Sequence, residues 1–352
     1  MSHVVFTGGG SAGHVVPCFE LIQALRRRGV GISFVGSNSG MEEALLAWLN
    51  VDYYGISTGK LRRYLSANNL LDAFKVLGGI WQAYRLLGRL QPDVVFSKGG
   101  FVSFPVVFSA WLKSIPVVAH ESDLTPGLAN RLAMPFVKTL CINFSVTPTG
   151  SFGGRVIHTG TPLRESLTRG DASAGRRALE VANDDRILLI TGGSLGADVL
   201  NEVVYQALSR LTAEYVVVHV CGPGKTTAVE NPRYRQFEYV GEGWGDILAA
   251  ADLVVSRAGA NTLYELLALG KPNLLVPLSH HASRGDQVEN ATYAGGLGYS
   301  QVLDEDALSS ESLVAQIKAL DGELFQARER LALFVVPDSV GLICSELERF
   351  LP

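Results

Sequence analysis

Glycine-rich loops stand at two places where a β-branched run changes to a helical pattern. The first is GGGSAGH at 8–14, after VVFT, and the second is GGSLGA at 192–197, after ILLIT. Glycines let the backbone approach a ligand closely, and the amides at a helix N-terminus attract phosphate. Either loop alone is also compatible with a tight turn that binds nothing. Together, the two loops predict binding of a diphosphate and of a group that is transferred from it.

The first loop also matches the dinucleotide pattern G-x-G-x-x-G, through Gly8, Gly10 and Gly13. A nicotinamide or flavin site needs Asp or Glu at the end of the next strand, ~20 residues on, to bind a ribose hydroxyl. That strand ends in GSN at 36–38, and the first carboxylate after it is Glu42. The sequence therefore does not support an NAD site.

The elements that must position these loops alternate between strand and helix patterns. Short β-branched runs lie at 4–8, 32–36, 93–97, 116–120, 187–191, 215–220, 253–256 and 274–278. Helical spacing separates them, most clearly at 16–28, 70–90, 197–211 and 261–269. This alternation predicts an α/β fold with parallel sheets, and the almost wholly apolar strands predict sheets covered on both faces.

Each glycine loop opens about half of the chain, which predicts two Rossmann-like domains in series. The length of 352 residues agrees, because a domain takes ~150 residues. Gly160 and Pro162 interrupt the pattern, so we expect domains at 1–160 and 161–337. A last helical pattern, within 338–352, is expected to pack back toward the first domain.

Composition excludes several classes of protein. With 47% hydrophobic residues, 18% charged residues and a net charge of −4, the chain is neither disordered nor a general nucleic-acid binder. Its four cysteines are far apart in sequence, so neither a disulfide framework nor a zinc site is predicted. No apolar run reaches the ~20 residues of a spanning helix, and no signal-peptide pattern is present. We therefore expect a soluble or peripheral protein.

Seven segments, in order along the chain, carry a family resemblance. They are TGGGSAGH (7–14), KGGFVSFP (98–105), HESDLTPGLANR (120–131), GTPLR (160–164), GGSLGA (192–197), SRAGANTLYELLALGKPNLLVPL (256–278) and RGDQVENA (284–291). Together they resemble the MurG family, the lipid II-forming N-acetylglucosaminyltransferases of glycosyltransferase family 28. The resemblance implies a GT-B fold, with two Rossmann-like parallel-sheet domains facing a central cleft. It also implies an inverting transfer of GlcNAc from UDP-GlcNAc to the MurNAc O4 of lipid I, undecaprenyl-diphospho-MurNAc-pentapeptide.

The same resemblance implies a UDP-GlcNAc site in the second domain. It places the Ser194 hydroxyl and the Arg164 guanidinium at the diphosphate, where hydroxyl, amide and cation stabilise a leaving group. Glu265 would accept the ribose hydroxyls. A structural reading of Glu265 is less favoured, because a lone carboxylate among apolar neighbours needs a partner.

Three further donor contacts follow from the resemblance. The Val240 backbone would bind uracil, and the Gln287 and Asn290 amides would bind GlcNAc hydroxyls. A local structural role for Asn290 stays open. No cofactor is expected, because amides and Arg164 can neutralise the diphosphate without a metal ion. The one acidic triplet, 304–306, is interpreted as the N-terminal cap of a helix.

Two residues are candidate bases for the acceptor hydroxyl. His14 begins the first helix, where an imidazole could take the proton. Asp123, in a polar cluster with His120 and Glu121, stands where many family members have Asn, and it is ionisable. The choice between them stays open. Further substrate-binding residues implied by the resemblance are Ser11, Ala12, Gly13 and Asn130.

Residues 60–90 combine six cations with only one carboxylate, a local charge of +5, and interleave them with Phe74, Trp81 and several Leu. A core-facing helix with a basic edge is the common explanation of such a stretch. The lipid-linked acceptor instead favours docking on an anionic inner leaflet. We therefore expect a peripheral enzyme on the cytoplasmic face of the plasma membrane, near other cell-wall synthesis proteins and active in cell shape and division.

Three alternatives remain. The fold also suits a glycosyltransferase with another lipid acceptor, although the segments at 98–105 and 120–131 argue against it. A UDP-GlcNAc 2-epimerase would need further acid–base groups and no lipid acceptor. A non-catalytic scaffold would not need both the donor-site and the acceptor-site motifs.

Overall fold

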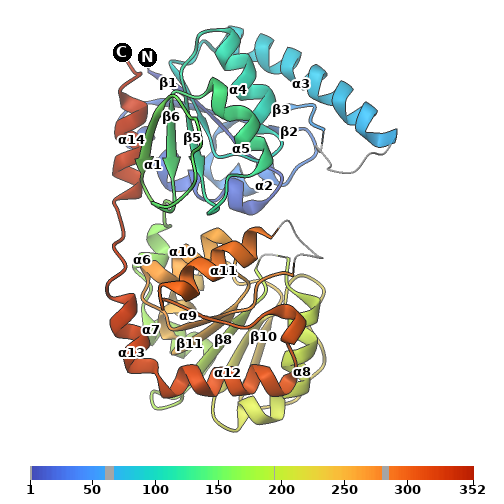
Figure 1. Ribbon diagram of the computed structural model, residues 1–352, viewed down its shortest axis with the longest axis vertical. Coiled ribbons are helices and arrows are strands. Elements are labelled where there is room, and N and C mark those ends of the chain that lie inside the picture. The colour runs from blue at the N-terminus through green and yellow to red at the C-terminus, as the bar shows by residue number, and fades with distance from the viewer. Residues whose placement is uncertain (1, 60–66, 194, 280–284) are drawn as a thin grey trace. The chain divides into compact units, whose positions relative to one another are not determined.

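The computed structural model describes residues 2–59, 67–193, 195–279 and 285–352, and for helix residues 67–73 only the backbone (Figure 1). The chain divides into two compact units. Unit 1 consists of Met1–Pro162 and Pro337–Pro352, and unit 2 of Leu163–Val336. The expected domain limits, after residues 160 and 337, lie close to these boundaries.

Unit 1 is built on a seven-stranded sheet whose neighbouring strands are all parallel. The order is β3-β2-β1-β4-β5-β6-β7. The strands are β1 (His3–Thr7), β2 (Gly31–Ser37), β3 (Asp52–Ile56), β4 (Val94–Ser97), β5 (Val117–Glu121), β6 (Thr139–Ile142) and β7 (Arg155–His158). The predicted runs at 4–8, 32–36, 93–97 and 116–120 are confirmed as β1, β2, β4 and β5, which form the middle of the sheet.

Helices cover both faces of this sheet, as its apolar strands predict. They are α1 (Cys18–Arg27), α2 (Glu42–Leu46), α3 (Ala67–Leu90), α4 (Ser103–Leu112), α5 (Leu128–Ala133) and α14 (Ser339–Glu348), with short 3-10 turns η1 (Ala12–His14), η2 (Ala47–Leu49) and η3 (Met134–Phe136). Alternate residues of β1 enter different cores. Val4 and Phe6 pack with α1 and α14, while Val5 packs with α3 and α4.

Unit 2 has a six-stranded parallel sheet in the order β10-β9-β8-β11-β12-β13. Its strands are β8 (Ile187–Thr191), β9 (Val216–Val220), β10 (Tyr234–Phe237), β11 (Leu253–Ser256), β12 (Asn273–Leu275) and β13 (Gln301–Val302). Its helices are α6 (Glu165–Thr168), α7 (Ala172–Leu179), α8 (Asp198–Thr212), α9 (Trp244–Ala250), α10 (Ala260–Ala268), α11 (Asp286–Gly296), α12 (Ser310–Gly322) and α13 (Leu324–Leu331), with the 3-10 turn η4 (Glu305–Ala307).

Both glycine loops follow a central strand of their sheet. β1 lies between β2 and β4, and β8 lies between β9 and β11, so the chain continues to opposite sides from these points. Ligands of open parallel sheets bind outside the carboxyl ends of the strands at such a switch point. The topology therefore places each glycine loop at a position where open parallel sheets bind their ligands.

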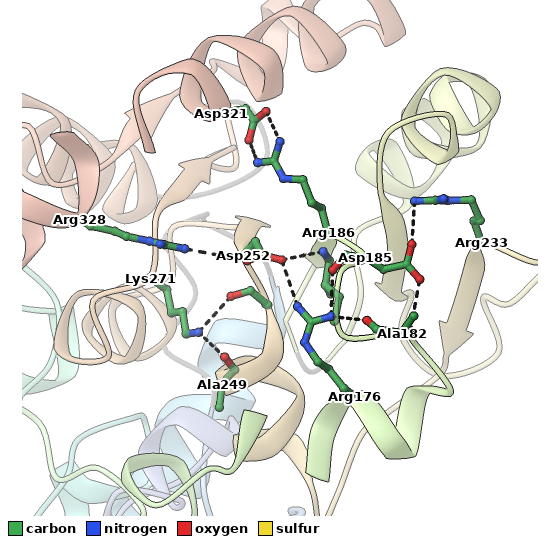
Figure 2. Close-up of polar contacts among 12 residues, drawn as sticks. Arg176, Ala182, Asp185, Arg186, Arg233, Ala249, Asp252, Lys271, Asp321 and Arg328 are labelled. Atoms are coloured by element: carbon green, nitrogen blue, oxygen red, sulfur yellow. Dashed lines mark hydrogen bonds and ion pairs between the residues drawn. The ribbon is translucent and has the colours of Figure 1, made fainter. Parts of the chain in front are cut away.

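The opposite, amino edge of the unit 2 sheet is held by an ion-pair network (Figure 2). The Asp252 carboxylate, just before β11, accepts the Ile187 amide at 2.9 Å and faces Arg176 at 3.6 Å. Nearby, Lys271 Nζ donates to the carbonyls of Ala249 at 2.7 Å and Ala251 at 3.0 Å. These contacts fix the strand starts, which leaves the carboxyl edge to the ligand loops.

Candidate active site

The glycine loop after β1 packs directly against the loop after β4. Gly9 N donates to Gly99 O at 3.3 Å. A Cβ on Gly8 would lie 2.4 Å from the His14 carbonyl oxygen, and one on Gly100, whose φ is +86°, would lie 2.0 Å from Gly9 O. Only glycine permits this approach.

The Glu42 side chain contacts this loop, and the sequence analysis did not predict this contact. Its side chain is fully buried, Oε1 accepts the Gly10 amide at 2.8 Å, and Oε2 accepts the Ser37 hydroxyl at 3.2 Å. A carboxylate of the protein itself thus accepts the hydrogen bond of one amide in the loop. The sequence shows Glu42 only as an acidic residue in the first turn of α2, where acidic residues are common.

The predicted residues of the first glycine loop lie in and around η1. Ser11 is exposed and extended, and its side chain makes no capping hydrogen bond, while Ala12 and Gly13 are half-buried. His14 Nδ1 lies 3.2 Å from the Lys98 carbonyl oxygen. Because a carbonyl only accepts, Nδ1 carries the proton, and Nε2 of the neutral ring is the nitrogen able to take another.

The loop after β5 holds the second candidate base. The buried Glu121 carboxylate accepts the amides of Asp123 at 2.9 Å and Gly127 at 3.0 Å, and the Asn130 side-chain amide at 2.8 Å. Asn130 is itself buried, and its Oδ1 has no hydrogen-bond partner among the described residues. Glu121 therefore anchors the loop, and Asp123 is presented by it.

His120 is excluded as a base by its surroundings. Its ring is completely buried, and Nε2 lies 2.8 Å from the Gly160 carbonyl oxygen. Burial, reinforced by the nearby Lys98, holds the pKa of His120 well below its usual value. The ring is therefore neutral and closed to a substrate proton.

In unit 2 the side chains of Arg164 and Glu265 interact electrostatically. Glu265 lies on α10, and burial raises its pKa to about 7, although Arg164 and a hydrogen bond from the Trp244 side chain oppose the rise. Arg164 stands before α6, and its buried Nε has no hydrogen-bond partner in the described part of the chain. A carboxyl with a raised pKa near a buried guanidinium nitrogen that has no described partner is typical of a functional site.

Val240 lines a cavity of about 300 Å³ between α7, the end of β10 and the start of α9. The lining residues are Ala178, Leu179, Phe237, Tyr239, Val240, Gly241, Glu242, Gly243, Asp246 and Ile247. Trp244, which contacts Glu265, directly follows this loop. One short segment therefore links Val240, expected to bind uracil, through Trp244 to Glu265, which is expected to bind the ribose.

The two predicted amides on α11 contact neighbouring loops. Gln287 is half-buried, and its Oε1 accepts the Leu278 amide at 3.1 Å. Asn290 is fully buried and donates to the Ala258 carbonyl oxygen at 3.1 Å. The local structural role that the sequence left open for Asn290 is thus present, and its contact with a sugar stays a prediction.

Ser194 lies outside the described residues, but its neighbours define the loop. Gly193 has φ of +84°, and its amide donates to Thr191 Oγ1 at 3.2 Å. Gly196 passes so close to β9 that a Cβ would lie 1.9 Å from the Cys221 carbonyl oxygen. The 15-residue helix α8 begins at once, so its free amides point toward this loop.

As expected for 304–306, Asp304 stands at the N-cap position of η4, and Glu305 and Asp306 lie in its first turn. The Asp304 side chain makes no capping hydrogen bond, while the nearly buried Glu305 pairs with Arg257 and accepts the Ser279 amide at 3.0 Å. Although burial opposes it, the Ser279 amide and Arg257 hold the pKa of Glu305 below its usual value. Arg257 also donates to the Val276 carbonyl oxygen at 3.0 Å. The pair joins the segments after β11 and β13, and its further hydrogen bonds hold the loop after β12, a role that distance in sequence conceals.

Within the described residues, no group of three His, Cys, Asp or Glu side chains could hold a metal ion. No helix in the same part of the chain is long and apolar enough to cross a membrane.

Comparison with known proteins agrees with this geometry. Residues 4–142 match the glycosyltransferase family 28 N-terminal domain and residues 187–332 its C-terminal domain. A UDP-N-acetylglucosamine--N-acetylmuramyl-(pentapeptide) pyrophosphoryl-undecaprenol N-acetylglucosamine transferase from Clostridium perfringens is 49% identical over 320 residues, 90% of each chain. A protein of the same name from Clostridium kluyveri is 44% identical over 352 residues, 99% of this chain and 100% of its own.

Among solved structures, MurG from Acinetobacter baumannii superposes with a TM-score of 0.79 at 26% identity, covering 99% of this chain and 100% of its own. The expected fold class is confirmed, because both units have the Rossmann-like parallel sheets of GT-B glycosyltransferases. This chain therefore belongs to the MurG family of N-acetylglucosamine transferases, within glycosyltransferase family 28.

Proposed function

We propose that this protein transfers GlcNAc from UDP-GlcNAc to the MurNAc 4-hydroxyl of lipid I and so forms lipid II. The single observation that carries the proposal is the identity of 44–49% with transferases named for this reaction over most of the chain. The electrostatic interaction of Arg164 with Glu265 supports the choice of a nucleotide sugar as donor, and so does the hydrogen bond to Glu265 from Trp244, which directly follows the segment that lines the Val240 cavity.

Unit 2 binds the donor in this proposal. Uracil occupies the cavity at Val240, and the ribose hydroxyls donate to Glu265. The Arg164 guanidinium and the amides at the start of α8 stabilise the diphosphate, whose negative charge grows as the glycosidic bond breaks. These groups act most strongly in the transition state, so they favour departure of UDP.

Unit 1 activates the acceptor. A base removes the proton of the MurNAc 4-hydroxyl, the oxygen attacks the anomeric carbon of GlcNAc, and UDP leaves in the same step. A single displacement inverts the anomeric centre and forms no covalent enzyme intermediate. Both candidate bases have suitable chemistry, since His14 Nε2 can accept a proton and Asp123 is an ionisable carboxyl on an anchored loop.

We further infer that one face of unit 1 docks reversibly on an anionic membrane surface at the cytoplasmic side of the plasma membrane. Phe74 and Trp81 of α3 are 64% and 60% exposed, while Ala83 and Leu87 on the opposite side of the helix are buried. Leu77 and Tyr84 complete the exposed stripe at helical spacing. Large exposed apolar patches of this kind mark interaction sites.

The neighbouring helix α4 packs against α3 (Figure 1). Its exposed Trp111 and Leu112 extend this surface. Cations lie among the rings, with Arg85 4.9 Å from the Trp81 ring centre and Lys113 Nζ 3.8 Å from that of Tyr84. Apolar side chains interleaved with cations suit an anionic leaflet. Of the predicted segment 60–90, residues 60–66 lie outside the described residues, and α4 was not predicted to contribute.

The decisive experiment supplies UDP-GlcNAc together with lipid I in detergent and measures lipid II. The expected result is lipid II formation that depends on both substrates. A parallel reaction with UDP-GlcNAc alone tests the 2-epimerase alternative, whose product would be UDP-ManNAc. Absence of lipid II under conditions that keep the protein folded would refute the proposed function.

A further inference from the structure

Lys98 links the segments that carry the two candidate bases, and no motif pointed to it. It directly follows β4, and its amide donates to Thr7 O at 2.8 Å. Its carbonyl oxygen accepts from His14 Nδ1 at 3.2 Å, while its Nζ donates to Ser122 Oγ, the residue before Asp123. The backbone of Lys98 thus holds one candidate and its side chain reaches the loop of the other.

The ammonium of Lys98 is an unusual group for this position. The residue is 1% exposed, and burial of a charge is costly unless partners compensate. Burial lowers the pKa of Lys98, and the thiol of Cys18 and the carboxylates of Glu121 and Asp123 oppose that change. The titratable groups around it are Cys18 from α1, His14 from η1, His120 and Glu121 from β5, and Asp123 from the following loop.

Of these groups, Glu121 is already committed to the loop. Its two oxygens accept three hydrogen bonds from Asp123 N, Gly127 N and Asn130 Nδ2. Asp123 is half-buried, so its carboxyl combines access to a substrate with an electrostatic interaction with Lys98. An adjacent cation favours the ionised form of a carboxyl, which is the form a base requires.

We propose that Lys98 is a positioning residue for the acceptor base: its ammonium holds the Ser122–Asp123 turn and keeps Asp123 ionised for proton removal. The proposal rests on the proposed function, because it concerns the acceptor hydroxyl of that reaction. It also separates the two candidate bases. A side-chain substitution at Lys98 removes the cation near Asp123 but leaves the backbone carbonyl that holds His14.

The test uses Lys98→Met in the full chain, with lipid II formation followed from pH 5 to 9 on a short-chain acceptor. Methionine has nearly the length of lysine and suits a buried position. We expect kcat to fall roughly 10-fold, which is part of what a general base contributes. The pH profile to compare is that of kcat/KM for the acceptor, measured with UDP-GlcNAc saturating at each pH so that Glu265 does not contribute. Its acidic limb should move to higher pH, because the Asp123 carboxyl loses its neighbouring cation. The KM for UDP-GlcNAc should stay unchanged, since the expected donor residues belong to unit 2.

A double-mutant cycle with Asp123→Asn tests the coupling directly. If Lys98 acts through Asp123, adding Lys98→Met to Asp123→Asn should cause little further loss. Lys98→Arg should retain the wild-type pH profile. Lys138→Met removes an exposed lysine of unit 1 and serves as the matched control, with unchanged turnover and pH profile. Should Lys98→Met not fold by thermal unfolding, Lys98→Gln, a neutral donor to Ser122, carries the same comparison.

An unshifted pH profile in the folded variant, or additive losses in the cycle, would overturn the inference and leave the proposed function intact. A rise in the KM for UDP-GlcNAc as large as the fall in kcat would also overturn the inference, because it would indicate a general structural defect. Failure of the wild-type protein to make lipid II would instead refute the proposed function itself.

Discussion

At the residue scale, the chemistry depends on side chains whose ionisation the fold has altered. Burial raises the pKa of Glu265 to about 7, so this carboxyl changes charge near neutral pH. His14 is held by a carbonyl in the tautomer that leaves Nε2 as the acceptor. The two residues lie in different units and can be tested separately.

The pH dependence of donor binding should follow Glu265. Only the ionised carboxylate accepts hydrogen bonds from both ribose hydroxyls, so affinity for UDP-GlcNAc should weaken as pH falls below about 7. The limit is ~10-fold per pH unit. Titration calorimetry between pH 5.5 and 8.5 measures this. Glu265→Gln should flatten the dependence and raise KM more than it lowers kcat. An identical pH dependence in this variant would contradict the role in donor binding.

The ranking of the two candidate bases should favour Asp123. Asp123→Asn should lose most turnover, by ~100-fold or more, while His14→Ala loses less. UDP-GlcNAc binding should be unchanged in both, because its expected residues are in unit 2. Steady-state kinetics with lipid I decide the order, and a larger loss in His14→Ala would identify His14 as the base.

At the element scale, α3 shows how the same helix can serve a core and a surface. Its buried side, with Ala83 and Leu87, packs in the core beside β1 and β4. Its other side exposes Phe74 and Trp81 next to the cations Arg85 and Lys113. The helix therefore has two apolar sides: one packs in the core, and the other is exposed.

Reversal of charge on this surface should weaken membrane docking. Lys75, Arg85 and Lys113 changed together to Glu should lower binding to anionic vesicles by roughly 100-fold or more, at ~1 kcal/mol for each basic residue removed. High salt should mimic the variant, since charges are screened beyond ~8 Å at 0.15 M. Activity on vesicle-borne lipid I should fall while activity on a short-chain acceptor persists.

The aromatic side chains of the same surface can be tested without a change in charge. Trp81→Ala should weaken vesicle binding, and Phe325→Ala, which removes an equally exposed ring from unit 2, should not. Vesicle binding that responds to neither salt nor these substitutions would place the docking surface elsewhere.

At the scale of the whole molecule, the last helix returns to the first unit. α14 follows unit 2 in sequence, yet it lies beside α1 of unit 1 (Figure 1). Its Ile343, Cys344 and Leu347 are completely buried in the core with α1. Arg28 and Glu348 add an ion pair at its end. Unit 1 is therefore completed only after the chain has built unit 2.

Leu347→Ala should destabilise unit 1 selectively. Loss of a buried leucine costs about 2–5 kcal/mol, a large part of the stability of one domain. Calorimetry should show one transition at lower temperature and one unchanged, and UDP-GlcNAc should still stabilise the unchanged one. A single transition that shifts as a whole would contradict independent units.

The sequence by itself determined the elements that depend on local patterns. Apolar runs correctly predicted β1, β2, β4 and β5 in unit 1 and β8, β9, β11 and β12 in unit 2, because interior strands are apolar on both faces. The glycine loops marked the strand-to-helix turns, since only glycine fits their close approaches. The ordered motifs indicated the family, and with it Arg164 and Glu265.

Tertiary structure alone decided which loops meet. The edge strands β3, β7, β10 and β13 contain polar residues and gave no apolar signal, and the interior strand β6 was also not predicted. Glu42 reaches Gly10, and Glu305 reaches Arg257. Gly10 and Glu42 follow the neighbouring strands β1 and β2, whereas Arg257 and Glu305 follow β11 and β13, which lie on either side of β12, so strand order places each pair at one edge of its sheet. Local pattern does not encode that order, so long-range contacts such as the one between Lys98 and Ser122 emerge only when the sheet forms.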